Sequence, residues 1–288
     1  MLYALSLTME NSLLRDLIRR SLAEDLGDGD HSTLACIAPE SSGKARLLIK
    51  DKGILAGIRV AKVLFNTVDA DLKPEIILED GAGISPGDVA FYLSGRKHSI
   101  LKSERLVLNI MQRMSGIATS THEYVKRLEG LKTRILDTRK TTPGLRFLEK
   151  EAVRIGGGIN HRMGLYDMIM LKDNHIDYAG GIENAILRTR EYLDKNKLGL
   201  KVEIESRNLE EIKRIIAAGG VDRIMLDNFS VEETKAAVSL IDGRFETESS
   251  GGITLETVRS YAECGVDYIS VGALTHQIRS LDMSLKVI

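Results

Sequence analysis

The stretch KVEIESRNLEEIKRIIAAGGVDRIMLDN, residues 201–228, decides the fold class of this chain. It opens with a strand pattern, KVEIES, and closes with another, RIMLDN. Between them, apolar residues recur at the three- and four-residue spacing of an amphipathic helix. Because a helix between two strands carries the chain back across the sheet, the two strands are expected to be parallel. Residues 201–228 therefore predict a β–α–β unit.

The same alternation extends in both directions from this unit. Helical sequence separates four further strand patterns: RILDT (134–138), MIMLKD (168–173), FETESS (245–250) and YISVGA (268–273). Six strand–helix alternations imply a parallel sheet with helical crossovers, and closing that sheet into an α/β barrel is the most economical arrangement. A doubly wound open sheet is the alternative, although no G-x-G-x-x-G motif follows the first strand.

The first hundred residues have a different, α+β pattern. Residues 13–26 repeat leucine and isoleucine on one helical face, and residues 43–50 alternate as a strand. Turn residues occupy positions 85–88, between two apolar stretches. A helix is expected from Ser103, as its N-cap, to about residue 128, and it connects the two parts of the chain.

Composition limits the class of partner and the compartment. The 288 residues carry 40 Lys and Arg against 41 Asp and Glu, so no global field marks a nucleic-acid or membrane-surface binder. Cys36 and Cys264 lack zinc or redox spacing, and reduced thiols are expected. The opening Met1–Met9 lacks the basic start of a signal peptide. With no uncharged apolar run of 18 residues, a cytoplasmic protein is expected.

The carboxyl ends of the predicted strands are unusually polar. In α/β barrels the reactive groups lie at these ends. Glycine-bearing ESSGGIT and SVGALTH follow the last two strands, where barrels commonly bind phosphate through backbone N–H groups. Glu205 and Asp227 end two other strands, and they could bind hydroxyls or a hydrated magnesium ion.

Cations gather in the middle of the chain. Because the planar guanidinium of arginine matches carboxylate and phosphate oxygens, they indicate a ligand with several anionic groups. The cations expected to bind it are Arg139, Lys140, His161, Arg162, Lys172 and His175. Arg146, Lys150 and Arg154 are instead expected on a solvated helix face.

One long stretch, DTRKTTPGLRFLEKEAVRIGGGINHRMGLYDMIMLKDNHI (137–176), strongly resembles the quinolinate phosphoribosyltransferase family. SERLVLNIMQRMSGIAT (103–119), IMLDNF, ESSGGI and GVDYISVGALTH extend the resemblance over most of the chain. It implies an N-terminal α/β sandwich (1–115), an incomplete α/β barrel (116–276), and a tail (277–288) that returns to the first domain. It also implies homodimers with shared active sites.

The resemblance further implies a role for each site residue. Quinolinate carboxylates should meet Arg139, His161, Arg162 and Lys172, with Arg105 coming from the partner subunit. Lys140 should lie near pyrophosphate and the reacting centre, and Glu205 and Asp227 near the ribose and its Mg²⁺. Glu203 also fits the family's acidic position, but the start of the next helix favours Glu205. The remaining substrate-binding positions implied are Thr138, Ser250, Gly251, Gly252, Val271, Gly272, Ala273 and His276.

Three other functions compete with this interpretation. A phosphoribosyltransferase for a monocarboxylate such as nicotinate would leave several cations without partners. A phosphate-ligand sensor on a barrel scaffold would not need Lys140, Lys172, Glu205 and Asp227 together. A barrel aldolase could use Lys172 as a Schiff base, although a binding role among so many charges is simpler.

Overall fold

The computed structural model describes residues 2–288, with side chains from residue 12 onward, so that Met1, the first residue of the predicted sandwich, lies outside the described residues. The chain divides into two compact units. Unit 1 contains the chain up to Ser120 together with Thr142–Gly157 and Gln277–Ile288, and unit 2 contains Thr121–Thr141 and Gly158–His276. In the described part of the chain, no helix has the length and apolar character needed to cross a membrane.

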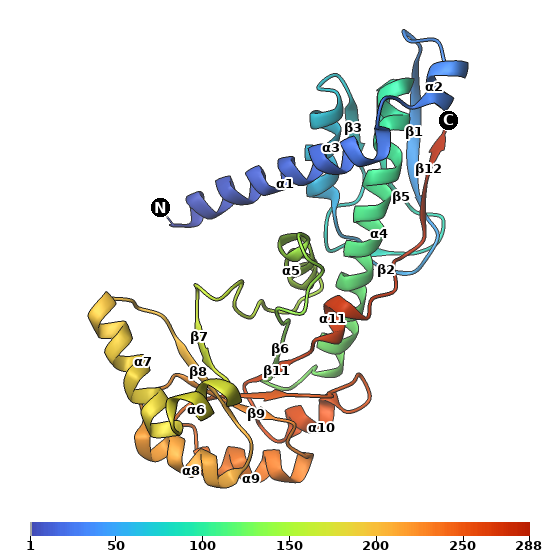
Figure 1. The fold of residues 1–288 in the computed structure, drawn as a ribbon. Coiled ribbons are helices and arrows are strands. Elements are labelled where there is room, and N and C mark those ends of the chain that lie inside the picture. The colour runs from blue at the N-terminus through green and yellow to red at the C-terminus, as the bar shows by residue number, and fades with distance from the viewer. Residues whose placement is uncertain (1) are drawn as a thin grey trace. The chain divides into compact units, whose positions relative to one another are not determined.

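Unit 1 is built on a four-stranded antiparallel sheet with the order β12-β1-β5-β3. The edge strand β12 comes from the C-terminal tail and pairs with β1, with Leu285 opposite Leu47 (Figure 1). The strands of unit 1 are β1 (Ser42–Ile49), β2 (Gly53–Ile54), β3 (Lys73–Ile76), β4 (Gly83–Ile84), β5 (Val89–Arg96) and β12 (Met283–Val287). Its helices are α1 (Leu2–Leu26), α2 (His31–Cys36), α3 (Ile58–Val68), α5 (Arg146–Ile155) and most of α4 (Lys97–Arg127).

The core of unit 1 follows from the alternation of its strands. Every second residue of β1 from Ala45 is buried, as strand geometry requires when one face of a sheet is covered. Phe65 of α3 and Phe91 of β5 are both 0% exposed and meet edge to face, with ring centroids 5.4 Å apart. This aromatic pair joins the helix to the sheet.

Unit 2 is a six-stranded parallel sheet with the order β6-β11-β10-β9-β8-β7. Figure 1 shows the helices that connect these strands along the outer side of the sheet. The strands are β6 (Arg134–Leu136), β7 (Ile169–Leu171), β8 (Val202–Ser206), β9 (Arg223–Asp227), β10 (Glu246–Ser250) and β11 (Tyr268–Ser270). The helices are α6 (Asp173–Ala179), α7 (Ile182–Asn196), α8 (Leu209–Ala218), α9 (Val231–Ile241), α10 (Val258–Glu263) and α11 (Ala273–His276).

This strand order is that of an incomplete barrel. Strands β7 to β11 lie side by side in chain order, and β6 joins the far side of β11. Among the described residues β6 and β7 do not pair, so the ring stays open between them. A doubly wound sheet would instead reverse its strand order partway. The predicted incomplete barrel with a separate N-terminal α+β domain is therefore confirmed.

The predicted domain boundaries place the whole connection from β6 to β7 in the barrel, whereas the structure divides this connection between the two units. The predicted barrel (116–276) includes Thr142–Gly157, but this segment clusters with unit 1. An ion pair joins α5 to α4 within unit 1, in which Arg113 Nη2 lies 2.6 Å from Glu149 Oε1. Glu149 is 1% exposed, so this pair fixes α5 firmly within unit 1.

Two local predictions are wrong. The long helix α4 begins at Lys97, directly after β5, and not at Ser103. Ser103 is 0% exposed inside the helix, and its hydroxyl donates to the Ile100 carbonyl, so it caps nothing. Lys150, expected on a solvated face, is 1% exposed, because it lies on the side of α5 that also buries Leu148 and Glu149.

Candidate active site

Three charged side chains meet at the carboxyl edge of the unit 2 sheet. Lys172 follows β7, Glu205 lies near the end of β8, and Asp227 ends β9. The Lys172 Nζ lies 2.5 Å from Glu205 Oε1. Burial and then the charge of Glu205 raise the pKa of Asp227, while Lys172 opposes them. We call Lys172, Glu205 and Asp227 the rim cluster.

The turn after β10 has no room for a side chain. Gly251 has φ +97°, and a Cβ there would lie 2.1 Å from Asn228 Oδ1. The Asn228 N–H donates to the Ser250 carbonyl at 2.8 Å, which holds this turn against the end of β9. Gly252, with φ +61°, continues the left-handed backbone. Asn228 was not among the predicted site residues, and its own positive φ of 58° shows only in the structure.

The segments that follow β6 and β11 also contact each other. Thr275 is 0% exposed, and its hydroxyl donates to the Lys140 carbonyl at 2.8 Å. A Cβ on Gly272 would lie 2.9 Å from His276 Nε2 and 3.3 Å from Lys140 Cδ. Lys140, Gly272 and His276 are therefore neighbours. Val271, which is 2% exposed, and Ala273, the first residue of α11, flank Gly272.

Asp137 anchors the segment that carries the central cations. It is 0% exposed, and its carboxylate accepts from Asn160 Nδ2 at 2.6 Å and from the His161 N–H at 2.8 Å. On the next residue, the Thr138 hydroxyl accepts the Lys140 N–H at 3.0 Å. The sequence placed Asp137 at a strand end but gave no sign that it binds residues 23 and 24 positions later.

Two guanidinium groups lie close together at this edge. Arg162 is 9% exposed, and its Nη1 donates to the Met168 carbonyl at 3.1 Å. Burial and then the positive charge of Arg139 lower the pKa of Arg162, so the two cations repel each other. An anion with two separate carboxylates would relieve that repulsion, because each guanidinium could bind one of them.

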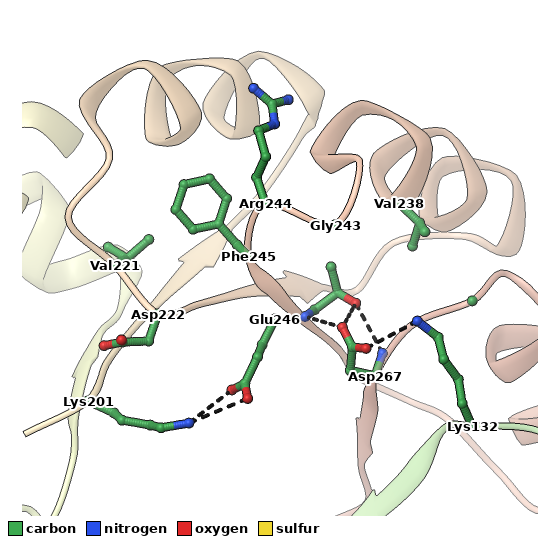
Figure 2. Close-up of a pocket in the computed structure, with 12 residues that line it drawn as sticks. Lys132, Lys201, Val221, Asp222, Val238, Gly243, Arg244, Phe245, Glu246 and Asp267 are labelled. Atoms are coloured by element: carbon green, nitrogen blue, oxygen red, sulfur yellow. Dashed lines mark hydrogen bonds and ion pairs between the residues drawn. The ribbon is translucent and has the colours of Figure 1, made fainter.

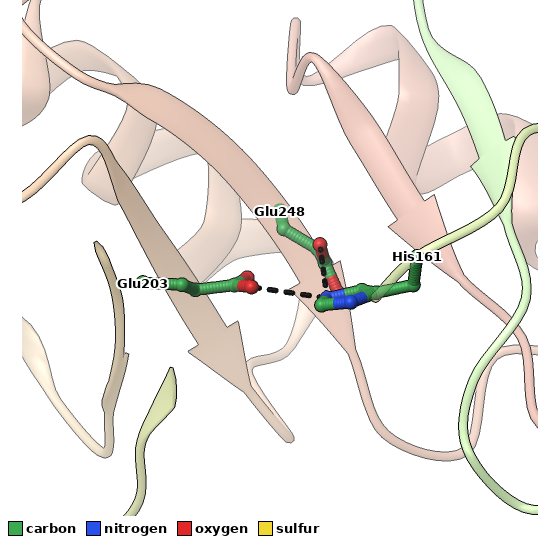
Figure 3. Close-up of side chains that lie close together, drawn as sticks. All are labelled: His161, Glu203 and Glu248. Atoms are coloured by element: carbon green, nitrogen blue, oxygen red, sulfur yellow. Dashed lines mark ion pairs between the residues drawn. The ribbon is translucent and has the colours of Figure 1, made fainter. Parts of the chain in front are cut away.

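His161 lies deeper than the other cations. Its Nε2 is 3.0 Å from Glu203 Oε2 and 3.4 Å from Glu248 Oε2, as Figure 3 shows, and its side chain is 5% exposed. Glu203 and Glu248 precede the edge residues Glu205 and Ser250 by two positions on the same strands, so they form the next layer down.

The charge states in this layer are coupled. Burial opposes ionisation of His161, but Glu203 and Glu248 outweigh it and raise the pKa of His161 to about 9. Burial and Glu248 raise the pKa of Glu203 to about 7. Burial also opposes ionisation of Glu248, but His161 and Arg223 lower the pKa of that carboxyl.

Glu203 and Glu205 occupy different positions on β8. Glu205 binds Lys172 beside Asp227 at the edge, whereas Glu203 is 0% exposed and faces His161. Unit 2 contains all the predicted site residues except Arg105, and several of them contact one another near the carboxyl ends of its strands. Arg105 belongs to α4 in unit 1, where it is exposed.

A second hollow lies at the opposite edge of the same sheet. Figure 2 shows this pocket of about 590 Å³, lined by residues that directly precede the strands, including Lys132, Lys201, Asp222 and Asp267. Lys132 Nζ lies 3.2 Å from Asp267, and Lys201 Nζ lies 3.4 Å from Glu246. The charges that line this pocket therefore pair with each other.

The residues that could hold a metal ion fall into two sets. His161, Glu203 and Glu248 offer ligand atoms within 4.8 Å of one another, but Arg223 Nη1 already binds Glu248 at 2.8 Å. At the edge, Glu205 and Asp227 offer two neighbouring carboxylates. Carboxylate oxygens with several waters suit Mg²⁺, so the edge is the better site for a hydrated magnesium ion.

Comparison with known families identifies both parts of the chain. Residues 30–115 match the family described as "Quinolinate phosphoribosyl transferase, N-terminal domain". Residues 117–286 match "Quinolinate phosphoribosyl transferase, C-terminal domain". Together the two matches cover nearly all of the described residues.

Individual relatives agree with these matches. The chain is 46% identical to "Quinolinate phosphoribosyltransferase [decarboxylating] 1b" of Nicotiana tabacum, over 95% of this chain and 82% of that protein. It is 43% identical to the "Probable nicotinate-nucleotide pyrophosphorylase [carboxylating]" of Bacillus subtilis, over 97% and 95%. The solved nicotinate-nucleotide pyrophosphorylase from Francisella tularensis superposes with a TM-score of 0.91 at 40% identity, covering 96% of this chain and 97% of that one.

Proposed function

Because the chain belongs to the quinolinate phosphoribosyltransferase family, we propose that the carboxyl edge of its barrel is the active site of that enzyme. The enzyme is a pentosyltransferase of de novo NAD biosynthesis. It joins quinolinate to phosphoribosyl pyrophosphate and releases nicotinate mononucleotide, carbon dioxide and pyrophosphate.

The Arg139–Arg162 pair carries this proposal. Two mutually repelling guanidinium groups, with Lys172 on the next strand end, suit a dianion better than a monoanion. Arg139, Arg162 and Lys172 bind the two quinolinate carboxylates, with His161 behind Arg162. Nicotinate has a single carboxylate for these two guanidinium groups, so it would relieve less of their mutual repulsion.

Phosphoribosyl pyrophosphate occupies the rest of the edge. Glu205 and Asp227 bind the ribose hydroxyls and hold a hydrated Mg²⁺, which neutralises the leaving pyrophosphate when it is bound. Lys140 lies beside the pyrophosphate. The 5-phosphate binds the glycine-bearing turns and their neighbours, namely Thr138, Ser250, Gly251, Gly252, Val271, Gly272, Ala273 and His276.

The bond changes need charge placement more than a nucleophile on the protein. The pyridine nitrogen bonds to the anomeric carbon as the bond to pyrophosphate breaks, and the sugar develops positive charge that Glu205 and Asp227 stabilise. The alkylated nitrogen then draws in the electron pair of the breaking ring–carboxylate bond. Carbon dioxide leaves, and the ring carbon takes up one proton. The side chains therefore act by orienting both substrates and by neutralising charge.

We propose further that the enzyme is a cytoplasmic homodimer in which Arg105 of the partner subunit completes each site. The resemblance of residues 103–119, which include Arg105, to the family supports the dimer. The two free cysteines suit a reducing compartment.

A direct assay tests the function. Purified protein with quinolinate, phosphoribosyl pyrophosphate and Mg²⁺ should produce nicotinate mononucleotide and carbon dioxide in equal amounts. Chelation of Mg²⁺ should stop the reaction, and nicotinate should be a poor substrate. Equal turnover of nicotinate, without release of carbon dioxide, would instead indicate a monocarboxylate enzyme.

A further inference from the structure

The interior of the barrel holds a group of charges below its carboxyl edge. His161, Glu203, Glu248 and Arg223, which we call the buried charge cluster, are each 9% exposed or less. Barrel interiors are usually filled by Val, Ile and Leu, and burying charge is costly even when it is paired. Because this cluster lies directly below the proposed substrate site, we expect its role to concern that site.

The imidazole of His161 can adopt only one orientation in this cluster. Its Nδ1 accepts the N–H of Arg162 at 2.7 Å, and its Nε2 faces the carboxylates of Glu203 and Glu248 at 3.0 and 3.4 Å. Turning the ring over would place carbon atoms at both positions and lose every one of these contacts. Because the accepting Nδ1 carries no proton, the ring proton lies on Nε2, which faces the carboxylates.

The carboxylates are themselves fixed from the side away from the site. Arg223 Nη1 lies 2.8 Å from Glu248 Oε2, and the guanidinium stacks over the ring of Tyr268, 4.0 Å from its centroid. Because Arg223 occupies an oxygen of Glu248 and adds a positive charge, a metal ion at His161, Glu203 and Glu248 is disfavoured. The cluster is thus a support for the imidazole.

The imidazole in turn supports Arg162. The main chain of Arg162 is held by His161 Nδ1, and its guanidinium is held by the Met168 carbonyl at 3.1 Å. Glu203 also attracts the Arg162 charge, in opposition to the repulsion from Arg139. Interactions with His161, Met168 and Glu203 therefore fix the position and the charge environment of Arg162.

We propose that Glu203 and Glu248 are positioning residues of the dicarboxylate subsite, and that they act through His161 on Arg162. Both side chains are 0% exposed, so they do not touch the substrate. This inference rests on the proposed function, because it takes Arg162 to bind a quinolinate carboxylate.

Glu203→Gln and Glu248→Gln test the proposal by removing the charge while keeping the shape. Each should raise the KM for quinolinate by about 10-fold or more, because a carboxylate facing His161 Nε2 loses its charge behind the binding cation. The KM for phosphoribosyl pyrophosphate should stay the same, and kcat should change less than the quinolinate KM. Glu246→Gln is the matched control, since Glu246 lies on β10 and also pairs with Arg223 but does not contact His161. It should keep both KM values.

A spectroscopic measurement keeps the test decisive if a variant is inactive or fails to fold. In ¹⁵N NMR, the His161 ring, assigned with His161→Gln, should show a protonated Nε2 in the wild-type protein. That signal should move in Glu203→Gln and Glu248→Gln and stay in place in Glu246→Gln. Wild-type quinolinate KM in both folded variants, or a wild-type His161 ring protonated only at Nδ1, would overturn the proposal.

Arg162→Ala separates this proposal from the proposed function. If Arg162→Ala leaves the quinolinate KM unchanged, the dicarboxylate subsite itself is misplaced. If Arg162→Ala raises that KM while both glutamine variants match wild type, only the positioning role fails.

Discussion

At the scale of the residue, the first prediction concerns the cations of the carboxyl edge. Arg139→Ala, Arg162→Ala and Lys172→Ala should each lower kcat/KM by roughly 10-fold or more, because each removes a charge-assisted bond worth about 2 kcal/mol. Circular dichroism should show an intact fold. Lys201→Ala is the control, since Lys201 lines the pocket at the opposite edge of the sheet. Full activity in all three edge variants would refute the site.

The second prediction concerns the turn after β10. Gly251→Val should weaken binding of phosphoribosyl pyrophosphate, because a Cβ would lie 2.1 Å from Asn228 Oδ1 at a backbone angle of φ +97°. Gly199→Val is the matched control, since a Cβ at Gly199 meets no atom within 4 Å and its backbone is not left-handed. Saturation curves for phosphoribosyl pyrophosphate measure its binding to both variants and to the wild type. Superimposable curves for Gly251→Val and wild type would place the phosphate elsewhere.

Single residues also show where the sequence stops being informative. Strand alternation could place Glu203 and Glu205 on the same face of β8, but it could not say which layer each occupies. The layer depends on His161, which comes from a different segment 42 positions before Glu203. Lys150 shows the same limit, because a charged helical residue predicts solvent exposure unless a particular tertiary contact buries it.

At the scale of the element, β12 supplies the third prediction. Leu285 is 7% exposed and faces Leu47 across the strand pair, whereas Lys286 is exposed. Leu285→Ala should lower the free energy of unfolding of unit 1 by about 2 kcal/mol or more, through lost burial and a residual cavity. Lys286→Ala, on the same strand, should change it little. Urea denaturation followed by fluorescence or circular dichroism measures both, and equal midpoints would argue against a structural role for the tail.

The elements of unit 2 could be predicted well because their signal is local. All six strands and the helices α7 to α10 follow from short apolar runs alternating with helical spacing, whereas α6 was not predicted. Strand ends were less accurate, and β6, β7 and β11 stop two or three residues before the predicted ends. Those residues leave the ladder to form turns, which the apolar pattern alone does not reveal.

At the scale of the whole molecule, the fourth prediction is a shared active site in a homodimer. Arg105→Ala and Lys172→Ala homodimers should each be nearly inactive, because every site lacks a needed cation. After joint unfolding and refolding, about half of the dimers should be mixed, and two-fold symmetry leaves one of the two sites in each mixed dimer intact.

Activity should therefore recover to roughly a quarter of wild type, once mixed dimers are demonstrated by mass spectrometry. Refolding each variant alone is the control and should restore nothing. If proven mixed dimers stay inactive, Arg105 and Lys172 serve the site of the same subunit.

Strand β12 is the last part of unit 1 to be synthesised. Unit 1 is assembled from three separate segments, and the last of these is the C-terminal Gln277–Ile288. During synthesis the barrel segment is complete before β12 is made, so β1 has an unpaired edge until β12 emerges. An open strand edge invites pairing with other nascent chains. Loss of β12 would therefore leave β1 with an open edge and favour aggregation of the chain.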